Sequence, residues 1–577
     1  MTLHMKYLTS GMLKALAPGI TLPFLLTALL LLPAESSAQN NMNKEVNVVR
    51  PYSPSISDAF KLKFIPTLDD TVQARVKFDY FIQPVQLNPA FRLRELGAAS
   101  LRPESSPKLK NSWVKLGFGN YWTPYAEVDI HTTQNTRSSL GVQLRHLSSQ
   151  GRVMMDDGRK VYAGYADNEV RMHGSRFFKG STLSAEAYFT EDHHFLYGYN
   201  TDTLTDGSIV TPWASRVKEK DSLDLQRFII VGSHFRLRSN ERSRNGFEYQ
   251  LKGGYDFLLD DMKELEHNGV LDFSLSKVFN KFSVGGELGA EYVYRPYTPD
   301  TLNYAVAHLD PWVGFTWKYV SLMAGPKVAM DRNGGQFHFY PRMKMEINIT
   351  NLLVPYLGLD GYYENHTYRS ISRENPYIAD MPLILPTNHR FVAYGGLRGR
   401  FTPKVAFNLA VSWKDVQGMH FFVADTSALF DNKFLLLYDD GEVLTMGGEV
   451  SLRQSDQLSF ILKGNYYQYK LDNIQAPWHK PGWDLNFTAR YSWRNKLAFR
   501  SDLFVLGDYS VPEIDPALGG VRQLDGLIDL NIGMEYRIKP FISLWLQGNN
   551  LLSDHYFIWQ NYPMHRINFV GGVTFIF

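Results

Sequence analysis

The sequence predicts an all-β protein, a transmembrane antiparallel β-barrel of about 22 strands (range 16–22) that follows a Pro-rich extended arm. Three observations support this fold: apolar and polar residues alternate with a period of two in many segments, short and long connections alternate, and the composition suits strands. Aromatic residues make up 14% of the 577 residues, and 44 residues are glycine. Lys+Arg number 60 and Asp+Glu 58, and this balance gives no reason to expect a nucleic-acid partner.

Residues 1–38 have the pattern of a secretory signal peptide. Lys6 and Lys14 supply positive charge, the run Ile20–Leu32 is mostly apolar, and Ser36-Ser37-Ala38 places small residues at the cleavage position. The apolar run is shorter than the roughly 20 residues of a membrane-spanning helix, which favours a signal over an anchor. The sequence contains 0 cysteines, which excludes disulfides, a lipidated cysteine and thiolate metal sites.

Residues 39–110 are rich in proline and show too little periodicity for a packed domain, so we expect an extended periplasmic or lumenal arm. Within it, Glu45-Val46-Asn47-Val48-Val49 resembles the short box by which transporters engage the energy-transducing protein TonB. An ordinary short extended strand is the alternative, since runs of this kind are common. We treat these five residues as a possible partner-docking segment.

The region 111–577 is predicted to be the barrel, because its segments alternate strictly between apolar and polar side chains. In the segment 404–414 Val405, Leu409 and Val411 lie on one face, while Asn408 and Lys414 lie on the other. In a barrel the apolar face meets lipid and the polar face meets the lumen. The polar residues that we expect to line the lumen are Glu287, Glu291, Lys414, Glu449, Arg453, Arg500, Asp502, Asp529 and Glu535. They could form a polar conduit or binding surface, or could pair with one another and hydrate the interior.

The connections between these strands alternate in length. Short turns are expected near 279–282, 401–404, 453–456, 494–496 and 537–540, and longer polar stretches near 197–220, 295–304, 368–388, 415–432, 471–482, 507–524 and 549–565. Barrels of the outer membrane have short periplasmic turns and long external loops. Counting hairpins back from the C-terminus gives about eleven pairs, which is the basis of the 22-strand prediction.

The run Ile567–Phe577 is predicted to be the closing strand. Its apolar face ends on Phe575 and Phe577, an aromatic C-terminal signal typical of barrels inserted into the outer membrane. We therefore expect the protein to reside in the outer membrane.

The final hairpin resembles that of TonB-dependent receptors, in which an N-N-[IL]-L-x-[DN]-x-Y segment precedes an aromatic loop and the last strand. Here the matching residues are Asn549-Asn550-Leu551-Leu552-Ser553-Asp554-His555-Tyr556, followed by Trp559, Tyr562-Pro563 and the closing strand. The resemblance implies a 22-strand barrel. The arm and first strand also resemble barrel proteins of Bacteroidota-type bacteria. The receptors carry a globular plug before the barrel, and residues 39–110 do not have the length or pattern of one.

No motif indicates an enzyme, a cofactor or a metal. The sequence lacks the G-x-S-x-G and H-E-x-x-H patterns. His193 and His194 are neighbours on an expected strand and would point to opposite faces, so they are better placed on a solvated rim than around one ion.

The sequence favours solute binding or transport across the outer membrane, in a porin-like or receptor-like barrel. The alternative is a non-transporting barrel subunit of an envelope assembly. The partners expected are outer-membrane lipid, the barrel-assembly machinery that inserts such proteins, and a periplasmic or surface protein that the arm could dock.

Overall fold

The computed structural model describes residues 112–132, 137–200, 224–240, 246–296, 303–331, 335–350, 352–428, 430–513 and 520–577. The expected signal peptide, the arm and its segment Glu45–Val49 lie outside these residues. All described residues belong to one compact unit.

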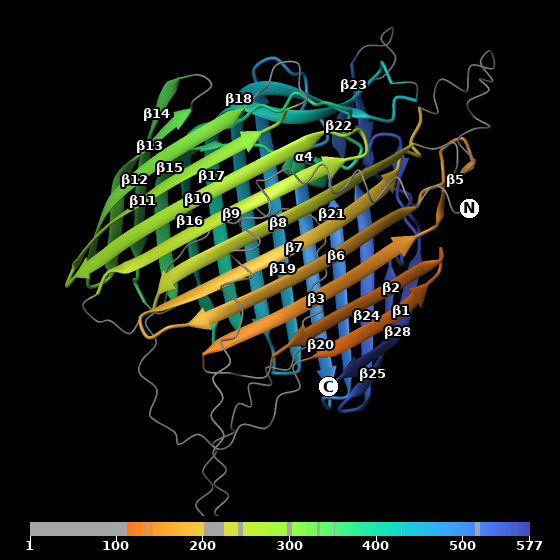
Figure 1. Cartoon of the computed structure of the whole chain (residues 1–577), viewed down its shortest axis with the longest axis horizontal. Coiled ribbons are helices and arrows are strands. Elements are labelled where there is room, and N and C mark those ends of the chain that lie inside the picture. The colour runs from red at the N-terminus through yellow and green to blue at the C-terminus, as the bar shows by residue number, and fades with distance from the viewer. Residues whose placement is uncertain are drawn as a thin grey trace, which may run out of the picture. The chain divides into compact units, whose positions relative to one another are not determined.

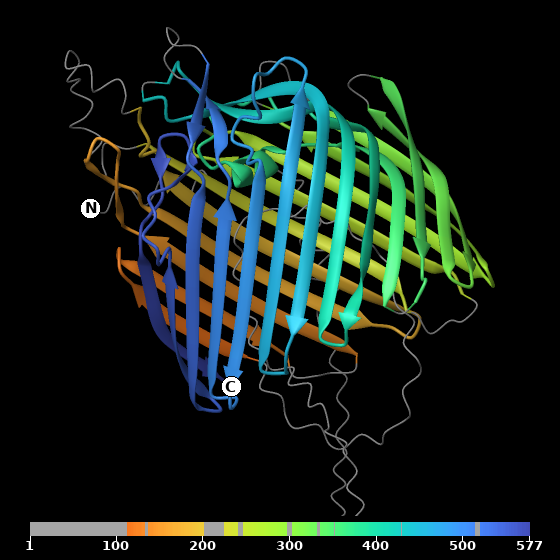
Figure 2. The same ribbon diagram turned by 180° about the vertical axis from the view of Figure 1, so that it is seen from behind.

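Twenty-two antiparallel strands form one closed sheet, because the first strand, β1, pairs with both β2 and the last strand, β28 (Figures 1 and 2). This confirms the predicted fold class and strand number. The strands are β1 (Trp113–Gly119), β2 (Thr123–His131), β3 (Ser138–Ser149), β6 (Tyr165–Phe177), β7 (Ser181–Phe195), β8 (Leu225–Ser239), β9 (Glu248–Asp260), β10 (Leu265–Phe279), β11 (Phe282–Tyr294), β12 (Tyr304–Trp317), β13 (Val320–Asp331), β14 (Gln336–Ile347), β15 (Leu353–Glu364), β16 (Thr387–Thr402), β17 (Val405–Ala424), β18 (Phe434–Arg453), β19 (Leu458–Leu471), β20 (Trp483–Trp493), β21 (Leu497–Leu506), β24 (Leu527–Lys539), β25 (Ile542–Asn549) and β28 (Asn568–Ile576).

Within the residues that the structure describes, the loops add three two-stranded hairpins and one short helix to this sheet. The hairpins are β4 (Arg152–Met154) with β5 (Lys160–Tyr162), β22 (Tyr509–Pro512) with β23 (Val521–Leu524), and β26 (Phe557–Trp559) with β27 (Tyr562–Pro563). The helix is α4 (Tyr368–Glu374). Within the described part of the chain, no helix is long and apolar enough to cross a membrane.

The alternation in the sequence decides which face of the sheet meets lipid. On β11, Val284, Leu288 and Tyr292 are 47%, 55% and 43% exposed, whereas Glu287 and Glu291 on the other face are only partly exposed. An exposed apolar outer face around a polar interior is the arrangement of a barrel in lipid. Phe575 and Phe577 belong to the outer face, at 42% and 58% exposure.

The connections at the two ends of the barrel differ in the way the sequence predicts. The end with the turns 280–281, 318–319, 403–404, 494–496 and 540–541 is called the turn end, and the other, with the longer connections, the loop end. By the usual asymmetry of such barrels the loop end is external. One expected loop is wrong in part: residues 415–424 continue β17, across a bulge between Val416 and Met419.

The wall is far taller on one side than on the other. β17 and β18 have 20 residues each, whereas β1 and β25 beside the seam have 7 and 8. The upper parts of β17 and β18 curve over the loop end (Figure 2). Phe422 and Phe434, in these upper parts, are buried in the apolar cluster described below.

Prolines explain the weakest joint of the sheet. β14 pairs with β13 over all of its residues but with β15 only from Met343 to Glu346. Pro341, opposite Pro326 of β13, stands where the pairing with β15 stops. Because proline has no N–H to donate, it interrupts a ladder of hydrogen bonds.

Candidate functional site

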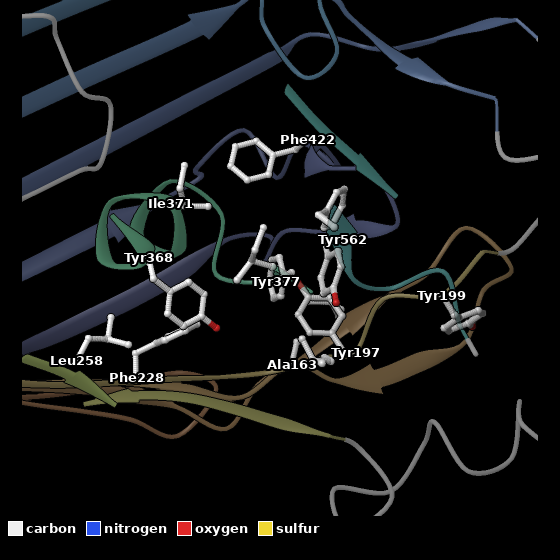
Figure 3. Packing of buried hydrophobic residues seen from close by; sticks show 14 of the residues in the cluster. Ala163, Tyr197, Tyr199, Phe228, Leu258, Tyr368, Ile371, Tyr377, Phe422 and Tyr562 are labelled. Carbon is white, nitrogen blue, oxygen red and sulfur yellow. The ribbon is translucent and has the colours of Figure 1, made fainter. Parts of the chain in front are cut away.

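An apolar cluster built from loops and strand tops lies at the loop end (Figure 3), and we call it the cap. Its buried members are Val153, Met155, Val161, Ala163, Tyr188, Leu196, Tyr197, Tyr199, Phe228, Ile230, Leu258, Tyr368, Ile371, Tyr377, Ile378, Ile384, Phe422, Phe434 and Tyr562. These residues come from four separate connections and from the strands beside them. The cap is therefore an apolar core shared by loops that are far apart in the sequence.

The segment 365–386, which we call the hook, contributes α4 and the centre of the cap. Thr367 caps α4: its hydroxyl accepts a hydrogen bond from Ser370 N, and Ser370 Oγ accepts one from Thr367 N. Such reciprocal capping satisfies backbone donors that the first helical turn leaves free. The helix ends at Glu374, and its C-cap Asn375 is extended because the residue before a proline, here Pro376, avoids the helical conformation.

The start of α4 is fixed to β10 by a buried carboxylate. Glu266 accepts hydrogen bonds from the backbone N–H groups of Tyr368 and Arg369, the second at 3.1 Å. The Tyr368 ring is fully buried, and its hydroxyl donates to Asp260 at 2.8 Å. Burial raises the pKa of Tyr368 well above its usual value, so the hydroxyl keeps the proton that it donates.

The end of α4 is held by charge. Glu374 accepts from Lys480 Nζ and lies beside His420 Nε2, both at 2.8 Å. Burial alone would raise the pKa of Glu374, but Lys480 and His420 outweigh it and hold this pKa well below its usual value. Glu374 is therefore an anion that ties the hook to β17 and to the loop 472–482.

His366 packs against the same group of residues. Its ring lies 4.6 Å from that of His420, and its Nε2 is 2.8 Å from the Thr387 hydroxyl. Burial, and after it the charge of His420, lower the pKa of His366 from 6.5 to about 4. The imidazole is accordingly neutral at physiological pH.

The aromatic centre of the cap joins three loops. The rings of Tyr377 and Tyr562 stack at 3.6 Å with an interplanar angle of 15°, and Tyr197 meets Tyr562 edge-on at 4.9 Å (Figure 3). The hydroxyl of Tyr562 donates to Asn432 O at 2.6 Å, and that of Tyr197 donates to Pro563 O at 2.9 Å. Every ring thus packs on apolar neighbours while its hydroxyl is satisfied, as buried tyrosine requires.

Beyond the stacked tyrosines the hook runs along the free edge of β18. Ala379 N donates to Phe434 O at 2.8 Å, and Phe434 N donates to Tyr377 O at 3.0 Å. An ion pair of 2.7 Å between Lys433 and Asp380 closes this contact. The hook therefore covers backbone groups that the taller β18 would otherwise leave open.

The hook also contributes to a polar network on the inner wall. Arg369 lies 2.6 Å from Asp256 of β9, and its guanidinium sits 5.1 Å from the centre of the Tyr188 ring. Asp256 also accepts from the Tyr188 hydroxyl and lies 2.9 Å from His234 Nε2. Both charge signs are present, so the wall below the cap is polar without a strong preference for either sign.

The nine polar residues singled out in the sequence lie around the wall and are not gathered at one site. Glu287 pairs with Arg342 at 3.2 Å, and Glu291 accepts from Asn365 of the hook at 3.0 Å. Arg500 and Asp502 pair with each other, Asp529 accepts from Tyr556, and Glu535 accepts from Ser543. Lys414 lies on β17, and Glu449 and Arg453 lie on β18. The register of these two strands places all three side chains on one face of the sheet. Their role in a passage stays a prediction.

Sequence reasoning missed the hook and the cap. The expected loop 368–388 contains most of the hook, and Thr367-x-x-Ser370 was a usable cap signal. Tyr377 and Tyr562 could not be paired from sequence, because each lies in a different loop. Among the residues that the structure describes, no group of three or more His, Asp or Glu side chains is arranged to hold a metal ion.

Comparison with known proteins identifies solved structures with a similar fold. No family model matches the sequence, and no curated protein does. Solved structures do resemble it. The ferric-catecholate import receptor Fiu of E. coli K12, in its closed form, aligns over 82% of each chain at 10% identity with a TM-score of 0.58.

Two further receptors give similar values. The siderophore receptor PirA of Acinetobacter baumannii aligns over 82% of this chain and 81% of its own at 10% identity with a TM-score of 0.60. The pyoverdine outer membrane receptor FpvA of Pseudomonas aeruginosa PAO1 covers 84% and 81% at 11% identity with a TM-score of 0.58. These neighbours are transport receptors rather than enzymes. The chain therefore has the fold of receptors that reside in the outer membrane, and its closed, apolar-walled barrel belongs there.

Proposed function

We propose that this barrel takes up a solute across the outer membrane and that the hook and the cap close its external mouth between uptake events. The observation that carries the proposal is the construction of the hook. It is a separate segment fixed by ion pairs at Glu374 and Asp380, hydrogen-bonded to the wall, and buried by loops that belong to no single hairpin. Such a segment can be displaced without opening any pair of barrel strands.

The similarity to siderophore receptors supports solute uptake as the class of function, but at this identity it supports nothing about the cargo. We propose TonB-dependent coupling as the energy source, with Glu45–Val49 as the contact. We further propose that residues 39–110 occupy the place of a plug in a Bacteroidota-type receptor. Both proposals rest on the sequence alone.

Planar-bilayer conductance tests the role of the hook. In the test variant a Gly-Ser linker of equal length replaces residues 365–386, and in the control the same linker is inserted into the turn 454–457 at the other end. We expect the hook variant to conduct in large steps and the control to match the unaltered protein. Equal conductance of all three proteins, both with and without residues 39–110, would refute closure by the hook. Deletion of residues 39–110 from the unaltered protein, from the hook variant and from the control then tests whether the arm closes the lumen as well.

One observation favours the alternative, a non-transporting subunit of an envelope assembly. The cap is as well packed as a domain core, with Tyr368, Ile378 and Phe434 at 0% exposure. A permanently closed barrel would remain silent even without the hook, and a stable partner would co-purify with it. Deleting the arm would then release that partner without changing conductance.

A further inference from the structure

The lipid-facing wall carries a depression of about 540 Å³ across β9 to β13. Small and large residues both line it. The small ones are Gly269, Ala290, Ala305 and Ala307, and the large ones are Tyr255, Leu271, Tyr292 and Met330. In the strand register Tyr292 stands between Gly269 and Ala305. The strand register explains the shape, because Ala290 lies opposite both Leu271 and Ala307, and Ala307 opposite Met330.

The depression has two distinct ends. Below it, Phe273, Leu288 and Leu309 face each other in register and are 40%, 55% and 51% exposed, so bulky side chains close that end. Above it, Tyr255 Oη lies 2.7 Å from His267 Nδ1, and the rings of Phe257 and Tyr294 lie 5.1 Å and 5.8 Å from that of His267. An apolar hollow therefore leads to a polar pair framed by aromatic rings.

The position along β10 places the hollow in the outer half of the membrane. His267 is near the loop end of the strand, and Lys277 near the turn end lies over the rings of Phe247 and Phe279. The residues between them rise about 24 Å at the usual strand rise and tilt, close to the roughly 25 Å apolar band of such barrels. His267 and its aromatic neighbours thus stand at the external interface, where rings with a polar edge are favoured.

We infer that the depression binds one acyl chain of an outer-leaflet lipid, with the lipid headgroup beside the Tyr255–His267 pair. A chain in the hollow meets protein on three sides instead of one, which increases the number of dispersion contacts. The one carboxylate among the lining residues, that of Glu291, does not oppose this, because it accepts a hydrogen bond from Asn365 of the hook on the lumenal side. A second copy of the chain is a poorer occupant, since specific protein interfaces bury at least about 1,000 Å², far more than this hollow offers.

Native mass spectrometry after extraction from nanodiscs of synthetic phosphatidylethanolamine tests the inference. Ala290→Phe with Ala307→Phe fills the hollow, and Val284→Phe adds the same ring to the lipid-facing side of the same strand outside it. We expect the unaltered protein and Val284→Phe to retain one more lipid than the filled variant, with about a tenfold loss of that bound species. Equal lipid retention by all three proteins would overturn the proposal.

Two additions keep the test decisive. Ala307→Leu fills the hollow less drastically and serves if the double variant fails to fold, and His267→Ala should weaken retention without filling the hollow. Repeating the extraction from nanodiscs that also contain lipopolysaccharide identifies the source of the chain. A retained phospholipid or a retained glycolipid supports the site, whereas loss from Val284→Phe equal to that from the filled variant contradicts it.

Discussion

At the scale of single residues, the chemistry of this protein is concentrated where α4 meets the wall. Glu266 and Glu374 bind the two ends of the helix, the first through backbone N–H groups and the second through Lys480 and His420. Neither carboxylate appears in the sequence as part of a motif. Only the fold brings β10, α4 and the loop 472–482 together, so no spacing rule could have selected these residues.

Replacing Glu374 by Gln should loosen the hook. The amide keeps the shape but removes the charge that pairs with Lys480, and hydrogen bonds to charged groups are worth about 1.5–3 kcal/mol. We expect amide hydrogen exchange in residues 366–386 to quicken by about one to two orders of magnitude. The matched control is Glu442→Gln, whose partner Lys470 is 76% exposed, because exposed pairs contribute only about 0–1 kcal/mol. Similar exchange in both variants would show that Glu374 does not anchor the hook.

Acid should loosen the cap in two stages. The pKa of His366 is lowered from 6.5 to about 4 by burial and His420, and burial lowers that of His479 likewise to about 4. Both imidazoles are neutral when folded, so their contribution is complete above pH 6.5 and is lost as the pH falls towards about 4. Because the pKa of Glu374 is held well below its usual value of 4.5, the stability that this carboxylate contributes is lost in a second stage as the pH falls below that value.

Hydrogen exchange of the hook from pH 7.5 to 4, corrected for intrinsic rates, checks this. The protection of the hook against exchange should decrease as the pH falls below about 6.5. In His366→Gln this decrease should be smaller in the upper part of the pH range. Protection that is unchanged across this range would contradict the roles assigned to the histidines.

At the scale of elements, the strands follow from local pattern and the loops do not. Lys404–Lys414 and Lys496–Val505 were predictable because each alternates by itself, and both lie within the observed β17 and β21 apart from their first residues. The sequence predicts a loop over the upper half of β17, because the segment Val416–Met419 breaks the alternation at a bulge. The β14–β15 joint was not foreseen either, because Pro326 and Pro341 become neighbours only in the sheet.

The seam between β1 and β28 depends on one glycine in particular. A Cβ at Gly572 would lie 1.8 Å from Leu116 O, a backbone atom of the neighbouring strand that cannot turn aside. Gly572→Val should therefore prevent closure of the barrel, seen as loss of the heat-modifiable fast-migrating band on gels. Gly533→Val is the control, because nothing lies within 4 Å of a Cβ built at Gly533. A folded band of normal intensity from Gly572→Val would show that the seam tolerates a side chain.

At the scale of the whole molecule, the barrel has a closed wall and, at its loop end, a separate apolar cap. The wall follows from alternation, turn length and the closing strand, all of which are visible in the sequence. The closure follows from contacts such as Tyr377 with Tyr562, which join distant loops and depend on the complete barrel. Under the proposed function, solute uptake requires displacement of the hook without rupture of the wall.

A cleavable crosslink between the hook and β18 is the most direct test of whether the hook closes the barrel. Asp380 and Lys433 form an ion pair, and the chain has 0 cysteines, so Asp380→Cys with Lys433→Cys can be joined by a short thiol crosslinker without competing thiols. Conductance is recorded in planar bilayers at pH 4.5, where the cap is loosened, before and after a cleavable crosslinker is reduced. The account predicts silence while the hook is locked and conductance after release. Equal conductance in the locked and released states would contradict closure of the barrel by the hook.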